Sequence, residues 1–344
     1  LIRFRESYAI RRLSPRGEAD LVRLIPDLLS LTGKTADPLE SLDRALTVLE
    51  AIGNRQVYLN LLLEKPTALH QQIGQHPLLL DELLDPRSLY QPLSKADLQR
   101  ELRRRLDGIE PDDLENYMVC LRQFKQAQVL KVAAADLVGA IPIMVVSDYL
   151  SYIAEVLLEE ALIESWRDLT RRHGCPPGGT PDQVFGFGVI AYGKLGGIEL
   201  GYGSDLDLVF MYEGDALSMT QGDKPLSLSE FYGRIAKRLI HLFSINTPAG
   251  FLYELDLRLR PSGKSGLLVT GLKAFETYQM TEAWTWEQQA LIKARFITGD
   301  PAIQQGFETI RKQSLCRERD LESLRADIVE MREKMREALG SKGN

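Results

Sequence analysis

The chain has 344 residues, of which 44% are apolar and 26% charged; this supports more than one hydrophobic core and excludes extensive disorder. A formal net charge of −6 disfavours a broad surface for nucleic acid or anionic membrane. Three scattered cysteines and four histidines without ligand spacing exclude a disulfide framework and a zinc site built from these residues. We therefore expect a cytoplasmic protein of about two domains with no transmembrane helix.

The first half of the chain predicts a helical domain over residues 1–174. Ser94 and Asp97 form a capping-box pattern ahead of an apolar stripe at helical spacing, and Pro111 can open the next helix. Ser147 is the expected N-cap of a longer helix that Gly174 ends. Such stripes are typical of the core of a helix bundle.

The segment 175–182 marks a change of structure, because its three prolines and two glycines cannot continue a helix. Beyond it, residues 184–192 and 205–212 are short apolar runs bounded by turn residues, as buried strands are. Residues 252–259 alternate between apolar and polar, and residues 229–243 predict an amphipathic helix before them. The expected fold is α+β and mostly helical, with a small mixed sheet.

Helices are expected again from about Lys273 onward. The predicted organisation is a helical domain (1–174), an α+β domain (183–271) and C-terminal helices (272–344). The last of these helices carries an apolar seam between Leu321 and Leu339. The seam belongs either to the core of this protein or to a dimeric coiled coil. A coiled coil needs more heptads than this helix has.

The residues with the clearest chemistry are Asp205 and Asp207, two carboxylates on one face of a predicted strand. Their repulsion would be relieved by Mg²⁺, which proteins often hold with carboxylates and substrate phosphates. The alternative is a solvated strand end that binds nothing. The preceding turn favours the metal site. Its glycines, at 193 and 196–197, let the backbone approach an anion closely, and Lys194 supplies a positive charge for phosphate.

A strand, a glycine turn, the ten-residue spacer 195–204 and an apolar-flanked Asp-x-Asp together resemble the DNA polymerase β-like nucleotidyltransferase superfamily. That superfamily usually has Ser or Gly at the position where this chain has Lys194. The resemblance implies a third carboxylate on a neighbouring strand. Asp256 fits this role, and Glu254 is its rival on the same face.

Three further residues flank these acids. Arg258 and Arg260 suit a triphosphate or pyrophosphate, or alternatively form a ladder of salt bridges with the neighbouring acids. Ser204 either contacts a phosphate or only fixes the turn.

Longer motifs resemble the glutamine synthetase adenylyltransferase family. They are HPLLLDELLD (76–85), LRQFKQAQVLKVAAADL (121–137), YGKLGGIELGYGSDLDLVF (192–210), LDLRLRPSGKSG (255–266) and AWTWEQQALIKAR (283–295). Members of that family have two related halves: one removes AMP from its target by phosphorolysis, and the other attaches AMP from ATP to a tyrosine of glutamine synthetase. The segment GYGSDLDLVF (201–210) is similar to the corresponding segment of the C-terminal, adenylylating half. Because the family continues with a further helical region, we expect a truncated C-terminal half.

The resemblance implies a two-metal nucleotidyltransferase with Mg²⁺ as cofactor and ATP as substrate. It implies glutamine synthetase as protein substrate and the PII signalling protein and glutamine as regulators, with neither nucleic acid nor membrane as partner. The implied catalytic and metal-binding residues are Asp205, Asp207 and Asp256, and the implied ATP-binding residues are Gly193, Lys194, Ser204, Arg258 and Arg260.

The sequence leaves three alternative functions open. The same carboxylates serve the deadenylylating half in the phosphorolytic direction. A non-catalytic regulatory module would bind proteins through its helices, although intact carboxylates at three positions argue against it. A polymerase acting on nucleic acid is disfavoured by the acidic net charge.

Overall fold

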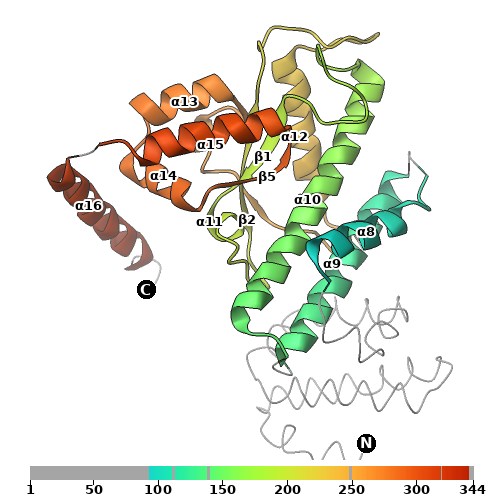
Figure 1. The fold of residues 1–344 in the computed structure, drawn as a ribbon, viewed down its shortest axis with the longest axis horizontal. Helices are drawn as coiled ribbons and strands as arrows, with labels where there is room; N and C mark the ends of the chain where they lie inside the picture. Colours follow the sequence, from blue (N-terminus) through green and yellow to red (C-terminus); the bar gives the residue numbers. More distant parts are fainter. Residues whose placement is uncertain (1–92, 111–112, 138–139, 248–249, 319, 341–344) are drawn as a thin grey trace, which may run out of the picture. The chain divides into compact units, whose positions relative to one another are not determined.

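The computed structural model describes residues 93–344, except 111–112, 138–139, 248–249, 319 and 341–344 (Figure 1). The motif at 76–85 and the helices predicted before residue 93 lie outside the described residues. The chain divides into two compact units. The first includes the chain up to Ile153 together with Asn246–Leu252, and the second consists of Ala154–Ile245 and Tyr253–Asn344. The domain limits given above stay predictions.

The first unit contains α8 (Lys95–Leu106), α9 (Leu114–Leu137) and the beginning of α10 (Ile143–His173). Ser94 is the N-cap of α8, as predicted, and its Oγ accepts a hydrogen bond of 3.3 Å from the Asp97 amide. The predicted apolar stripes supply the core of this unit. Its buried side chains include Leu98, Leu102, Tyr117, Met118, Leu121 and Phe124.

The start of α10 contradicts the predicted N-cap at Ser147. The helix begins earlier, at Ile143, because the Pro142 carbonyl accepts the first two amide hydrogen bonds of the helix. The fixed φ of proline suits a helix start, so Ser147 lies inside the helix. The predicted end is confirmed, since Gly174 follows with φ of 75°, in the left-handed region. Pro111, expected to open the previous helix, lies outside the described residues.

A five-stranded mixed sheet forms the centre of the second unit, with strand order β3-β2-β1-β5 and with β4 also paired to β2. Strand β1 is antiparallel to β2 and β5, whereas β3 and β4 are parallel to β2. The predicted fold class, α+β with a small mixed sheet, is confirmed. The strands are β1 (Phe187–Ala191), β2 (Leu206–Tyr212), β3 (Leu255–Asp256), β4 (Val269–Gly271) and β5 (Arg295–Gly299), of which β4 and β5 were not predicted.

Helices pack on both faces of this sheet (Figure 1). On one face, α12 (Leu228–Ser244), the predicted amphipathic helix, stacks Tyr232 on Phe187 with ring centroids 5.8 Å apart. On the other face lie α13 (Leu272–Thr281) and α15 (Pro301–Leu315). Their shared core includes Ile190, Val209, Met211, Phe275 and Phe307.

The predicted strand over 252–259 is mostly wrong, because only Leu255–Asp256 pairs as β3. Two physical causes are visible. Leu252 and Tyr253 are both buried, which interrupts the alternation. After Asp256 the chain turns, and the Arg258 amide donates to Asp256 Oδ1 at 2.8 Å.

The last predicted helix is confirmed as α16 (Leu321–Gly340). It contacts α14 (Thr285–Ala290), where the Thr285 hydroxyl donates to Asp327 at 2.6 Å. The described seam residues Leu324, Ile328 and Met331 are half-buried, so its two interpretations stay predictions. None of the helices described here combines the length and the apolar character that a bilayer crossing requires.

Candidate active site

The glycine turn predicted from the sequence lies directly against the aspartate strand. Strand β1 runs into the short helix α11 (Gly193–Gly196), where Gly193 has φ of 54°, in the left-handed region. A Cβ atom on Gly193 would lie 2.1 Å from Asp207 Oδ2, so this position requires glycine. The Tyr192 amide donates to the Asp207 carbonyl at 2.9 Å. The turn and the carboxylate are therefore held together.

Asp207 and Asp256 occupy the same register position on the parallel strands β2 and β3. Side chains at one register position of neighbouring strands share a face of the sheet. Asp205 precedes β2 and is exposed, Asp207 is half-buried, and the Asp256 side chain is 13% exposed. The rival, Glu254, is exposed, and its carbonyl accepts a hydrogen bond of 2.9 Å from the Leu206 amide.

The carboxylates also interact electrostatically. Burial raises the pKa of Asp207, and the negative charges of Asp205 and Asp256 raise this pKa further. The cations of Arg258 and Lys194 act in the opposite direction and lower it. The site therefore favours the uptake of positive charge, from a proton or from a cation.

Arg258 supplies part of that charge. Its Nε lies 3.0 and 2.7 Å from the two carboxylate oxygens of Asp256, and its Nη2 also donates to Oδ2. This is the salt-bridge alternative that the sequence left open. Arg260 donates to the carbonyls of Leu257 at 2.6 Å and Gly266 at 3.3 Å, so it braces the loop that follows β3.

Lys194 and Ser204, which stand at the two ends of the segment before β2, contact each other. Lys194 Nζ lies 3.4 Å from Ser204 Oγ, which also accepts a hydrogen bond of 3.1 Å from the Gly201 amide. Ser204 therefore fixes the turn before β2, which was one of its two predicted roles.

The donor atoms of this site are of the type that Mg²⁺ prefers, because carboxylate oxygens are hard ligands. Within the described residues, no three His, Cys, Asp or Glu side chains are assembled into a ready metal cage. Arg258 instead binds Asp256. In this structure the charge of Asp256 is therefore neutralised by Arg258.

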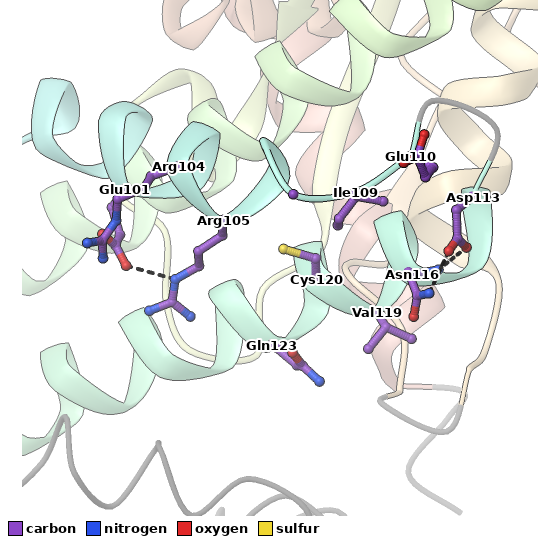
Figure 2. A pocket seen from close by; sticks show the side chains of 11 residues that line it. Glu101, Arg104, Arg105, Ile109, Glu110, Asp113, Asn116, Val119, Cys120 and Gln123 are labelled. Carbon is purple, nitrogen blue, oxygen red and sulfur yellow. Dashed lines mark hydrogen bonds and ion pairs between the residues drawn. The ribbon is translucent and has the colours of Figure 1, made fainter.

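A cavity of about 860 Å³ in the first unit is separate from these residues. It lies between α8 and α9, and Figure 2 shows Arg105 directed at Glu101 and Asn116 beside Asp113. The lining residues all fall between Glu101 and Gln123, so none of the predicted site residues contributes to it.

Sequence reasoning missed Arg295, which contacts the glycine turn, and Glu155, which pairs with Arg295. Arg295 forms an ion pair of 2.5 Å with Glu155 and donates to two carbonyls of α11. The motif 283–295 was the available signal for Arg295, because it marked the family resemblance without an assigned role. No local pattern marked Glu155 inside its long helix.

Comparison with known proteins identifies the class. The family model described as glutamate-ammonia ligase adenylyltransferase matches residues 59–310. Three curated relatives bear the name bifunctional glutamine synthetase adenylyltransferase/adenylyl-removing enzyme, so the class is that of adenylyltransferases. The chain belongs to the glutamate-ammonia ligase adenylyltransferase family, as the motifs predicted.

Each of the three relatives is 49% identical to this chain. The alignment with the protein of Methylococcus capsulatus covers 99% of this chain and 38% of the relative. The corresponding shares are 98% and 37% for Nitrosococcus oceani, and 96% and 36% for Thioalkalivibrio sulfidiphilus. The chain therefore spans less than two fifths of the length of these relatives.

Proposed function

We propose that the second unit transfers AMP from ATP to a tyrosine of glutamine synthetase and releases pyrophosphate. The observation that carries this proposal is the shared register of Asp207 and Asp256, with Gly193 packed against Asp207. The names of the relatives support glutamine synthetase as the target. The proposal includes regulation by the PII signalling protein and by glutamine, which the family resemblance implies.

Asp205, Asp207 and Asp256 would hold Mg²⁺ in this reaction. The bound metal would neutralise phosphate charge and assist deprotonation of the tyrosine. The raised pKa of Asp207 supports this assignment, because a cation relieves the repulsion that raises it. Arg258 would leave Asp256 and donate to the phosphates, which its 70% exposed side chain allows.

The remaining residues would orient the reactants. The tyrosine hydroxyl has an ordinary pKa of about 10, so it needs a metal or a carboxylate to promote the loss of its proton. In this proposal the Asp256 carboxylate lies on the side of the site from which the tyrosine attacks. The tyrosine oxygen then bonds to the α-phosphorus while the bond to pyrophosphate breaks on the opposite side. Lys194 and the Gly193 turn would face the departing pyrophosphate.

A protein substrate also requires access. The side of the site opposite the phosphates should be open to a protruding loop, and helical surfaces should provide the docking area. A single inserted tyrosine buries too little surface for specific recognition. A structure with ATP and Mg²⁺ in which this side is closed by the chain's own core would contradict a protein substrate.

The deadenylylating reaction uses the same carboxylates with phosphate as the attacking group, so direction needs a direct test. One reaction contains ATP and unmodified glutamine synthetase, and the other contains phosphate and the adenylylated enzyme. AMP incorporation in the first supports the proposal. AMP release as ADP in the second alone assigns the opposite direction. Absence of Mg²⁺-dependent ATP binding by calorimetry would favour a non-catalytic module.

A further inference from the structure

The motif at 283–295 has no role in the chemistry proposed above, yet its end packs on the turn that carries Lys194. The 3-10 helix η3 (Leu291–Lys293) packs against α11. A Cβ atom on Gly196 would lie 2.0 Å from the Lys293 carbonyl oxygen. The two backbones therefore touch, and this contact requires glycine.

Arg295 joins the same turn to α10. Its Nη2 donates to Glu155 Oε1 at 2.5 Å and to the Leu195 carbonyl at 3.0 Å, and its Nε lies 3.2 Å from the Gly196 carbonyl. The Glu155 side chain is only 2% exposed. A planar guanidinium can serve one carboxylate and two carbonyls at once, whereas a lysine ammonium is a single point of charge.

Helix α11 needs such support because its own structure is weak. It has four residues, which is too short for a helix to hold itself in water. Its first residue, Gly193, has φ of 54°, and Ile198, two residues after its end, has φ of 56°; both values are in the left-handed region. A β-branched residue in this region is strained and persists only where its surroundings fix it. The conformation of the turn therefore depends on outside contacts.

We infer that Glu155 and Arg295 form a positioning pair that fixes the α11 turn at a set distance from Asp207. This inference rests on the proposed function, because the positioned turn presents Lys194 to the nucleotide phosphates. The pair touches no reacting atom and acts through the two α11 carbonyls. Loss of the guanidinium fork should let the turn move and should separate Lys194 from the aspartates.

Arg295→Lys tests this pair, because it keeps the charge beside Glu155 and removes the fork. We expect Mg·ATP binding, measured by calorimetry, to weaken about 10- to 100-fold. Amide hydrogen exchange should rise in residues 192–199 and stay unchanged in β2. The matched control is Lys293→Gln, which breaks the exposed 2.5 Å pair with Glu199 on the same turn. It should bind Mg·ATP within about twofold of the wild type.

A double variant covers the case in which Arg295→Lys does not fold. Glu155→Gln with Arg295→Gln replaces the buried ion pair by a neutral pair, and it should show the same loss of Mg·ATP binding. Wild-type affinity in either folded variant overturns the positioning role, as does an equal loss in Lys293→Gln. Failure of the wild-type chain itself to bind Mg·ATP is a different result, which contradicts the proposed function.

Discussion

Asp207 and Asp256 stand at one register position, yet the chain supports them in different ways. Asp207 belongs to the seven-residue strand β2, which has paired strands on both sides and a glycine turn packed on its carboxylate. Asp256 belongs to a two-residue strand, and its carboxylate is bound by the guanidinium of Arg258. Packing therefore fixes the Asp207 side of the candidate site, which we call the packed side. The Asp256 side is held by the ion pair with Arg258, and we call it the charge-paired side.

The largest expected effects come from the aspartates themselves. Asp207→Asn and Asp256→Asn should each lower AMP transfer at least about 100-fold, because each removes a carboxylate from the proposed metal site. The measurement is the rate of transfer of labelled AMP. Glu254→Gln is the control, since Glu254 is an exposed acid on the same segment and should retain nearly full activity. An inactive Glu254→Gln beside an active Asp256→Asn would transfer the role to Glu254.

The packed side is tested by a pair of glycines. Gly193→Ala should lower the rate about 10- to 100-fold, because a Cβ there meets Asp207 Oδ2 and its backbone is left-handed. Gly203→Ala is the control, because a Cβ at Gly203 meets no atom within 4 Å. Initial rates and circular dichroism of both variants check this prediction. Equal activity of the two variants would show that contact with Asp207 is unimportant.

The charge-paired side is tested by metal binding without nucleotide. Arg258→Gln should bind Mg²⁺ several-fold more tightly than the wild type, because the competing cation on Asp256 is gone. Arg260→Gln should leave this affinity nearly unchanged, since Arg260 braces loop carbonyls instead. Isothermal titration with Mg²⁺ measures both. Unchanged affinity in Arg258→Gln would show that Asp256 is not a ligand.

The smallest expected effect is on stability. The folded-state pKa of Asp207 is raised above its unfolded value of about 3.9, so the ionised side chain disfavours folding. This penalty is absent below the unfolded pKa and develops as pH rises through the folded pKa. Asp207→Asn should therefore unfold at a higher temperature than the wild type near pH 7.5, and the difference should shrink toward pH 4.

Thermal unfolding at several pH values measures this difference. Addition of Mg²⁺ should raise the midpoint of the wild type more than that of Asp207→Asn. A variant that is less stable than the wild type at neutral pH would contradict the account of Asp207 as a strained carboxylate.

The sequence predicted the packed side well because its signals are local. Strands β1 and β2 are short, mostly buried apolar segments between turn residues, which is a pattern that a short stretch of sequence reveals. The strand predicted over 252–259 was too long. Alternation alone does not reveal that the Asp256 side chain accepts a hydrogen bond from the Arg258 amide and so turns the chain. Strand β5 was missed because its five residues are all half-buried and follow a helical segment.

The supports of the site were beyond sequence reasoning for another reason. Arg295 contacts the Gly196 carbonyl 99 residues away and the Glu155 carboxylate 140 residues away. A lone arginine and a lone glutamate at such separations carry no spacing signal. The roles of the predicted site residues, by contrast, came from their family pattern, and the structure brings Gly193, Asp207 and Asp256 together.

The most direct test of the central claim is transfer of AMP from ATP labelled on the α-phosphate to purified, unmodified glutamine synthetase. Wild-type chain and Asp207→Asn are compared with Mg²⁺ and with excess chelator. The account predicts label on a tyrosine of glutamine synthetase only with wild-type chain and Mg²⁺. Equal labelling by Asp207→Asn, or labelling that persists in chelator, would contradict it.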